Sequence, residues 1–268
     1  MAKKNQNEMS FLDHLEDLRW LLVRSTIAII IMAIVTYFIS DYLFDVVIFG
    51  PTRPTFFTYT FFCELSHSIG FADSICITEM PFIIQNTEME GQVNVFIWIC
   101  ILAGFILSFP YILWEIWKFI SPALYTNEKK NAKIFIFFSS LLFFLGVLFG
   151  YFVVIPMSVN FVATFTVSDV VKNQFTLDSY IGMVKTSVLA SGLFFELPII
   201  IYFLTKLGLV TPTFLRTYRK YAIVLVLIIA AIVTPPDVVS QTIVAIPMLL
   251  IYEASIWISV FVVKNKKE

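Results

Sequence analysis

Long, continuous apolar runs limit what this chain can fold into. Three of them cover approximately Trp20–Phe44, Val93–Trp117 and Ile134–Pro156. A membrane core of about 30 Å is crossed by about 20 residues of helix. These runs do not alternate polar with apolar residues, as the strands of a membrane barrel would. Because 59% of the residues are hydrophobic, the sequence predicts an all-α membrane protein and excludes a water-soluble globule.

A fourth run, Leu177–Val210, places one carboxylate, Glu196, near its middle. In a helix Glu196 would lie roughly 15 Å from Lys206, the charge that would mark one membrane surface. An ionisable side chain at that depth costs a few kcal/mol, so it marks a functional site by default. The alternative is a protonated carboxyl that only packs against a neighbouring helix. Pro198 should bend the helix beside it.

The last two apolar runs are shorter. Their uninterrupted cores cover Ala222–Val233 and Thr242–Tyr252, about 18 Å each as helix. We therefore expect thinning of the adjacent bilayer, unless flanking residues Tyr218–Tyr221 and Trp257–Val263 extend the helices. The six runs together predict six transmembrane helices, several of them kinked by proline, in one domain.

The distribution of charge predicts the orientation. All but three of the 18 Lys and Arg residues fall in the N-terminal region, two polar connections and the C-terminus; the exceptions are Arg53, Lys172 and Lys185. By the positive-inside rule both termini are cytoplasmic, and six spans satisfy that parity. Residues 45–92 then form a long external loop, and Ser158–Gln174 form a second.

Two polar segments add expectations. Residues 1–19 are expected on the cytoplasmic side, with an amphipathic helix over residues 10–22 that lies at the interface and carries Asp13, Glu16 and Asp17 on its polar side; the alternative is a solvated face without a partner. The long external loop contains Cys63 and Cys76, which on an oxidising side would form a disulfide. Two unpaired thiols are the alternative.

Enzyme chemistry is not indicated. The two histidines, His14 and His67, fall on opposite sides of the predicted membrane, and the sequence has no phosphate-binding glycine loop and no metal-ligand spacing. We therefore expect no catalytic residues, no metal and no cofactor. The charge distribution likewise gives no nucleic-acid footprint.

Four stretches carry a resemblance. They are FLDHLEDLR at 11–19, FISPALYTNEKK at 119–130, FFELP at 194–198, and TPPDVVSQ with the downstream AIPM at 234–248. In this order they resemble the motifs of the TatC family, the multi-spanning receptor subunit of the twin-arginine protein translocase. The resemblance implies a six-helix protein of the bacterial cytoplasmic (inner) membrane. It would bind twin-arginine signal peptides of folded precursors, work with small single-span TatA/TatB-like subunits, and self-associate.

The resemblance also implies roles for particular residues. The signal-contacting acids of the family fall on Asp17 and Glu128. Glu16 stands beside Asp17, and either carboxylate could make the contact; Arg19 matches the arginine of the same signature.

Further matches fall elsewhere in the chain. Glu196 matches the intramembrane acid of the family, and Pro51 matches a proline of its first external loop. Asp237 and Gln241 lie in the stretch that resembles its penultimate turn.

A proton-coupled transporter of small molecules or ions that uses Glu196 is the main alternative, and a structural scaffold is a third. A transporter should gather polar groups at the membrane midplane, whereas a peptide receptor needs acids on the cytoplasmic rim. The cluster of acids near the N-terminus, together with Glu128, favours the receptor. Paired carboxylates suit arginine because a guanidinium can bind a carboxylate through two hydrogen bonds.

Overall fold

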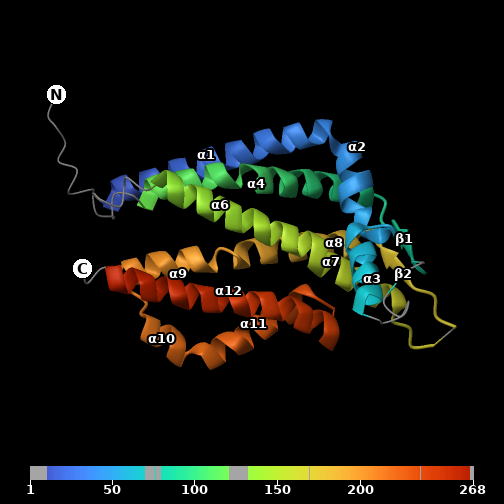
Figure 1. The fold of residues 1–268 in the computed structure, drawn as a ribbon. Coiled ribbons are helices and arrows are strands. Elements are labelled where there is room, and N and C mark those ends of the chain that lie inside the picture. Colours follow the sequence, from blue (N-terminus) through green and yellow to red (C-terminus); the bar gives the residue numbers. More distant parts are fainter. Residues whose placement is uncertain are drawn as a thin grey trace. The chain divides into compact units, whose positions relative to one another are not determined.

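A computed structural model describes residues 11–69, 76, 80–120, 132–168, 170–235 and 237–265 of the chain. These residues are mostly helical (Figure 1). The chain divides into two compact units. The first comprises Met1–Ser40 and Ile97–Leu141, and the second comprises Asp41–Phe96 and Leu142–Glu268.

The elements follow in chain order. The α-helices are α1 (Phe11–Phe38), α2 (Ser40–Tyr42), α3 (Phe57–Ile69), α4 (Gly91–Ile120), α6 (Ala132–Phe149), α7 (Ile155–Thr164), α8 (Leu177–Phe194), α9 (Leu197–Lys206), α10 (Pro212–Thr217), α11 (Arg219–Val233) and α12 (Val238–Asn265). Two π-helical segments, η1 (Leu43–Ile48) and η5 (Gly150–Val154), and a 3₁₀ turn, η2 (Gly50–Thr52), bend the chain. Two short strands, β1 (Ile83–Gln85) and β2 (Gln174–Thr176), pair in parallel.

Five helical stretches in the described part of the chain are long and apolar enough to cross a membrane. They are His14–Phe38, Gly91–Ile120, Lys133–Thr164, Leu177–Lys206 and Val238–Lys264. Helix α11, with 15 residues, adds a shorter apolar helix. The spans predicted from the sequence are therefore present as helices.

The first predicted boundary is wrong. The sequence predicts an interfacial helix over residues 10–22, followed by a separate span that ends at about Phe44, but α1 is one continuous helix from Phe11 to Phe38. The reason is that no glycine or proline interrupts this stretch, so the polar first turns simply continue into the apolar ones. The chain bends later, at α2 and η1.

The third span is longer than predicted. The sequence predicts an end at about Pro156, yet the helical stretch continues to Thr164. Pro156 lies in the first turn of α7, directly after the π-helical segment η5, where a missing N–H is tolerated. The second loop predicted to be external therefore begins after Thr164 and not at Ser158.

The last span is also longer than predicted. Helix α12 runs from Val238 through Glu253 to Asn265. Glu253 does not end the helix, because Arg219 pairs with its carboxylate at 2.7 Å. The flanking residues Trp257–Val263 therefore extend this helix, which is the alternative to a thinned bilayer beside it. Helix α11 is short, about 22 Å at 1.5 Å per residue. Thinning of the bilayer beside it stays a prediction.

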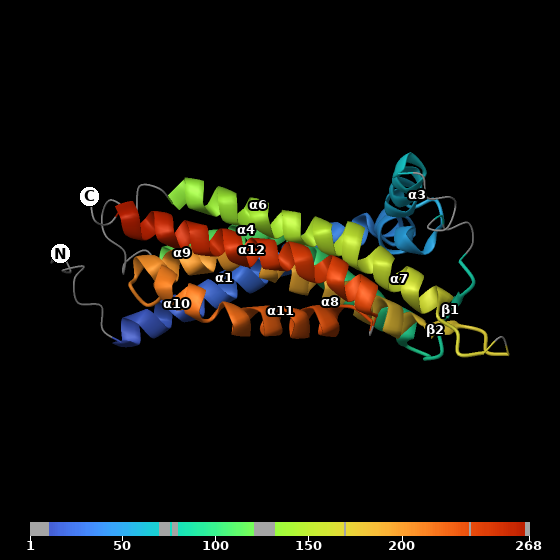
Figure 2. The same ribbon diagram turned by 60° about the horizontal axis from the view of Figure 1, so that its bottom comes forward.

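In the second unit, α12 lies along α9 and α11 (Figure 1 and Figure 2). A cluster of buried apolar side chains, including Val226, Ala230, Val244 and Met248, fills the contact between α11 and α12. Helix α6 approaches α8 closely, since a Cβ on Gly146 would lie 2.5 Å from the Ser191 carbonyl oxygen. These contacts bring Glu196, at the junction of α8 and α9, into a packed helical core.

Three tyrosines hold the turn around Pro51 in the same unit. Tyr151 donates to the Val47 carbonyl at 2.7 Å, Tyr180 donates to Ile48 at 2.5 Å, and Tyr59 donates to Pro51 at 2.9 Å. The π-helical and 3₁₀ geometry leaves these carbonyls without regular helical partners, and a buried carbonyl needs one. The three tyrosines, from η5, α8 and α3, are called the tyrosine cluster below.

Candidate functional site

The first unit places α1 directly against α4. A Cβ added to Gly104 of α4 would lie 2.7 Å from both the Ala33 nitrogen and the Ile29 carbonyl oxygen of α1. Only glycine leaves room for backbones this close. Figure 1 shows the two helices running alongside each other.

The beginning of α1 and the end of α4 meet. The rings of His14 and Phe119 stack with centroids 4.2 Å apart and an interplanar angle of 20°. Phe119 belongs to the FISPALYTNEKK motif, and His14 belongs to the FLDHLEDLR motif. Two motifs that are far apart in the sequence are thus adjacent in space.

A buried carboxylate lies one helical turn before Phe119 on α4. Glu115 of α4 is only 3% exposed, and it pairs with Arg24 of α1 at 3.2 Å and with Lys118 at 2.8 Å. A buried carboxylate with two cationic partners is strongly held, because removing it from water is compensated by charge pairing. Glu115 is not among the site residues predicted from the sequence. The spacing of Glu115 and Lys118, three residues apart on a helix, was the signal available.

Three of the residues predicted to bind a signal peptide lie at this end of the first unit. Glu16, Asp17 and Arg19 are on the first turns of α1, and all three are exposed. Glu128 lies outside the described residues. The described part of the chain before Glu128 ends at Ile120, the last residue of α4, which directly follows Phe119.

Glu196 and Pro198 lie in the second unit. Helix α8 ends at Phe194, α9 begins at Leu197, and Glu196 occupies the N-cap position between them. Pro198 is in the first turn of α9, so the predicted interruption of the helix is present. The Glu196 side chain is 6% exposed. A carboxyl group is therefore enclosed within a helix of transmembrane length.

Asp237 and Gln241 shape the turn between α11 and α12. The Asp237 carboxylate accepts a hydrogen bond from the Ser240 backbone N–H at 2.7 Å, which caps α12. This hydrogen bond holds the pKa of the carboxyl below its ordinary value of 3.8. The Gln241 amide donates to the Leu227 carbonyl at 3.1 Å and so joins the two helices. Both residues have structural roles in the turn.

Pro51, Cys63 and Cys76 belong to the segment predicted as the long external loop. Pro51 is buried, and its carbonyl accepts from Tyr59. Cys63 and Cys76 are joined by a disulfide, with Cα atoms 4.7 Å apart, as the sequence analysis expects. Far from being irregular, this segment contains η2, α3 and β1.

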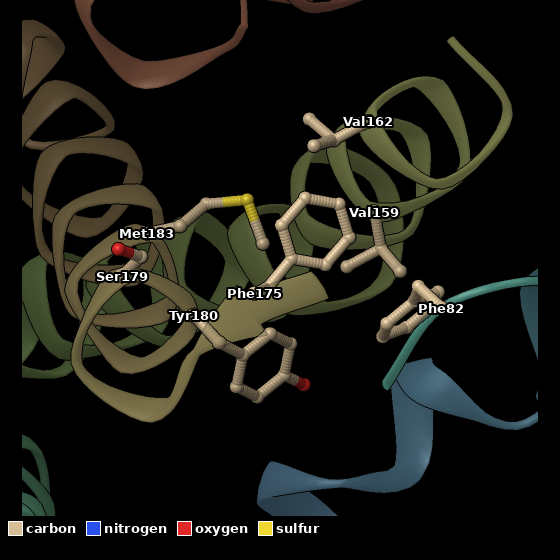
Figure 3. A pocket seen from close by; sticks show the side chains of 7 residues that line it. All are labelled: Phe82, Val159, Val162, Phe175, Ser179, Tyr180 and Met183. Carbon is tan, nitrogen blue, oxygen red and sulfur yellow. The ribbon is translucent and has the colours of Figure 1, made fainter. Parts of the chain in front are cut away.

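The second unit also contains two hollows. One, of about 190 Å³, is enclosed by apolar side chains from the β1 and β2 region, α7 and α8, including Phe82, Phe175 and Met183 (Figure 3). The other, of about 630 Å³, mixes Asp45, Arg53 and other polar groups with aromatic rings. Neither contains a residue that the sequence analysis assigns to signal binding.

Known proteins resemble this chain over nearly its full length. The family model for the Sec-independent protein translocase protein (TatC) matches residues 13–247. The TatC protein of Blattabacterium sp. subsp. Periplaneta americana is 42% identical, covering 98% of this chain and 100% of that protein. The TatC protein of Aquifex aeolicus is 35% identical, covering 97% and 98%.

A solved structure agrees with the sequence relatives. The crystal structure of a twin-arginine translocase receptor, TatC, is 33% identical and has a TM-score of 0.71, covering 93% of this chain and 99% of that one. These names describe a protein-transport component, and the match supports the six-helix fold, in which α11 is shorter than the five stretches of transmembrane length. None of these matches has the name of a transporter of small molecules or ions, so the alternative function gains no support. The motifs that meet in the first unit, the interrupted helix at Glu196 and the similarity over nearly the whole length lead to one conclusion: the chain belongs to the TatC family.

Proposed function

We propose that this protein is the receptor subunit of a twin-arginine translocase in a bacterial cytoplasmic membrane. It binds twin-arginine signal peptides through Asp17, Glu16 and Glu128 on the cytoplasmic face, with Arg19 in the same site. With small single-span subunits and further copies of itself, it then passes folded proteins across the membrane.

The His14–Phe119 stack is the observation that carries this proposal. At a centroid distance of 4.2 Å, it fixes the beginning of α1 beside the end of α4. Glu16 and Asp17 follow His14 on α1, and Glu128 follows Phe119 after nine residues of chain. Nine residues can span at most about 30 Å when extended, so a carboxylate at 128 has the reach to join the other two acids.

The ion pair between the exposed Arg24 and the buried Glu115 supports the same site. It ties α1 to α4 directly below the exposed acids, at 3.2 Å. A receptor that reads two adjacent arginines needs its carboxylates at a fixed separation, because a misplaced group loses most of the binding contribution. The ion pair and the close approach at Gly104 supply this rigidity.

The chemistry of the exposed acids suits the ligand. Guanidinium groups bind carboxylates through two parallel hydrogen bonds, whereas an ammonium offers only a point charge. The basic residues around Glu128, which include Lys129, Lys130 and Lys133, would repel a cationic peptide unless acids offset them. The site should therefore prefer Arg-Arg over Lys-Lys and weaken with salt.

The proposed orientation follows from the charges. The acids of the site share their side of the membrane with most of the 18 Lys and Arg residues, and this side is cytoplasmic by the positive-inside rule. External labelling of an engineered cysteine at residue 128 in intact cells should fail, and labelling at residue 90 should succeed. Strong labelling at residue 128 would contradict the orientation.

Glu196 is proposed as the intramembrane contact for a second subunit. Its carboxyl is enclosed where α8 gives way to α9, and an ionisable group within a helix of transmembrane length is expected to face a cavity or a partner helix. Glu196→Gln keeps the shape of the side chain, and Glu196→Ala removes it. If Glu196→Ala leaves both export and complex assembly unchanged, the residue is only a packing group.

A peptide-binding measurement tests the receptor. Labelled signal peptides with Arg-Arg or Lys-Lys are titrated at low salt against the purified protein in nanodiscs. Glu128→Gln should weaken Arg-Arg binding by about 1.5–3 kcal/mol, the range for a hydrogen bond to a charged group, which is about tenfold or more. Asp17→Asn and Glu16→Gln, measured separately, decide which carboxylate makes the second contact.

The matched control is Glu90→Gln, an exposed carboxylate in the segment assigned to the opposite face. It should bind the Arg-Arg peptide as the parent protein does. If the double variant Glu128→Gln, Asp17→Asn also binds like the parent, the receptor site is wrong.

A further inference from the structure

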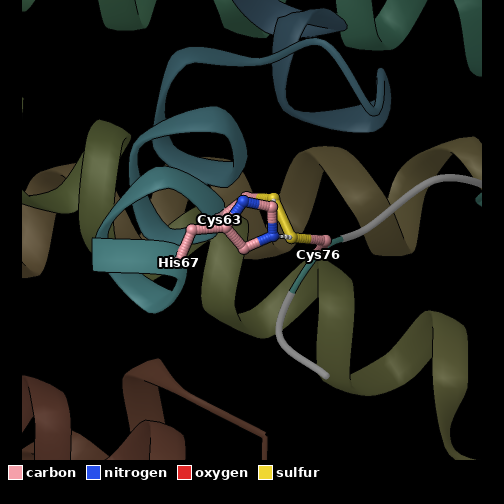
Figure 4. Close-up of a disulfide and its surroundings, with 3 residues drawn as sticks. All are labelled: Cys63, His67 and Cys76. Atoms are coloured by element: carbon pink, nitrogen blue, oxygen red, sulfur yellow. Dashed lines mark hydrogen bonds between the residues drawn. A yellow bond between two sulfur atoms is a disulfide. The ribbon is translucent and has the colours of Figure 1, made fainter. Parts of the chain in front are cut away.

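Three side chains with metal-ligating atoms meet beside α3 in the second unit. Cys63 and His67 lie one helical turn apart on α3, and Cys76 faces them from the chain that follows (Figure 4). Their donor atoms all lie within 4.8 Å of one another. The sequence has no metal-ligand spacing and predicts no metal site; the fold brings Cys76 beside Cys63 and His67.

The distances within this group match those of a zinc site. The His67 Nε2 atom is 3.5 Å from the Cys76 sulfur and 4.0 Å from the Cys63 sulfur. In tetrahedral zinc coordination, with Zn–S of about 2.3 Å and Zn–N of about 2.0–2.1 Å, a sulfur and a nitrogen ligand are about 3.6 Å apart. Two of the three separations are therefore already close to those that zinc requires. The third separation, between the two sulfurs, is shorter than zinc requires because the disulfide bond joins them.

We propose that Cys63, Cys76 and His67 form a zinc site when the two cysteines are thiols. Opening the disulfide takes two electrons from a dithiol or a phosphine, and two protons that come from the dithiol itself or, with a phosphine, from water. The dithiol becomes a disulfide, and the phosphine takes the oxygen of that water to become a phosphine oxide. Zn²⁺ then displaces the two thiol protons, and both thiolates and the neutral imidazole nitrogen bind it. The two sulfurs need to separate to about 3.8 Å, the distance between thiolates in tetrahedral coordination. Water completes the fourth position.

The surroundings permit entry of the metal. His67 is exposed and both cysteines are partly exposed, so an ion can approach from solvent without unfolding of α3. Thiolate and imidazole ligands together suit Zn²⁺ better than Mg²⁺ or Ca²⁺, which prefer oxygen. Cysteines enter every new chain as thiols, so the zinc-binding form exists before the disulfide does. The metal and the disulfide are then alternative ways to join Cys76 to α3, and bound zinc should slow oxidation.

The test compares the oxidised and the reduced protein. The full chain in detergent is reduced with a phosphine, the reductant is removed, and the protein is dialysed against Zn²⁺. We expect about one tightly bound zinc per reduced chain and none at this site in the oxidised chain. Replacement by Co²⁺ should give the thiolate charge-transfer absorption of a cysteine-bound metal. Zn²⁺ should also protect Cys63 and Cys76 from alkylation.

The two histidines of the chain provide a matched pair of variants. His67→Ala should weaken zinc binding by at least the roughly 10–100-fold that loss of an outer-shell partner causes, and Cys63→Ser should abolish the charge-transfer band. His14→Ala should leave binding unchanged, and so should Cys100→Ser, which removes the buried thiol of α4. The proposal fails if the reduced protein binds no zinc, or if His67→Ala and His14→Ala bind it equally tightly.

Discussion

The two compact units hold their helices together in different ways. In the second unit, the hydroxyls of the tyrosine cluster donate to backbone carbonyls around Pro51. The disulfide joins α3 to the chain that follows it. In the first unit, α1 and α4 meet through a bare backbone contact at Gly104 and one buried carboxylate, Glu115. The acids at the end of that pair remain exposed.

This difference separates a scaffold from a binding surface. Hydrogen bonds that satisfy buried carbonyls stabilise one conformation but present nothing to a ligand. Exposed carboxylates on a firmly packed helix contribute little to stability, yet they are available to a cationic partner. Substitutions in the tyrosine cluster should therefore change stability alone, whereas those that loosen α1 from α4 should also change signal binding.

Gly104→Val should have the largest effect. Its Cβ would lie 2.7 Å from backbone atoms of α1, which cannot move aside as a side chain can. We expect a loss of about 3 kcal/mol or more in the free energy of unfolding, the upper end for overpacking, and weaker signal-peptide binding. Thermal unfolding in detergent and peptide titration measure the two effects.

Gly182→Ala is the control for Gly104→Val, because a Cβ at Gly182 meets nothing within 4 Å. It should be neutral, or stabilising by up to about 1 kcal/mol from helix propensity. If Gly104→Val is as stable as Gly182→Ala, the close contact of α1 and α4 does not exist.

Tyr180→Phe should cause the second-largest loss in the free energy of unfolding. It removes the donor to the Ile48 carbonyl, a buried hydrogen bond of 2.5 Å, and leaving a buried acceptor unpaired costs about 1–3 kcal/mol. Signal-peptide affinity should stay the same. Tyr218→Phe, at an exposed tyrosine, is the control and should change neither quantity. Loss of peptide binding in Tyr180→Phe without loss of stability would overturn the distinction between scaffold and binding surface.

Glu115→Gln should have a smaller effect on stability. Removing one member of a fully buried ion pair costs about 3–5 kcal/mol, but Arg24 and Lys118 are 44% and 49% exposed and can turn to water. We expect about 1–2 kcal/mol, discounted for this exposure, together with weaker signal-peptide binding. Glu253→Gln breaks the more exposed pair with Arg219 and should cost less than about 1 kcal/mol. Equal stability losses in the two variants would mean that burial of Glu115 does not matter.

Much of the fold could be predicted from the sequence, because apolar runs and basic residues directly reflect the membrane. The interruption at Glu196 was predictable as well, since Pro198 removes a backbone donor. The ends of the helices were less predictable. Pro156 and Glu253 look like boundaries in the sequence, but a π-helical segment accommodates the first and Arg219 neutralises the second.

The candidate site was predictable only in part. The acids Asp17 and Glu128 came from the family resemblance, whereas Glu115 was missed because its partner Arg24 is distant in the sequence. The pairing of Cys63 with Cys76 was predictable, but the position of His67 beside both sulfurs was not. Side chains brought together by tertiary contacts leave no periodic signal in one sequence.

The smallest effect is expected at Asp237, in the turn before α12. Asp237→Ala removes the cap on the Ser240 N–H and should cost about 0.5–2 kcal/mol, whereas Asp237→Asn keeps a capping oxygen and should be nearly neutral at pH 7. The hydrogen bond lowers the pKa of the folded carboxyl below 3.8, so its contribution to stability is complete above the unfolded pKa. It is lost as the pH falls through the folded value. The difference in unfolding temperature between the parent and Asp237→Asn should therefore change only below about pH 4. A difference that instead changes between pH 5 and 8 would show that another group, and not this cap, governs the turn.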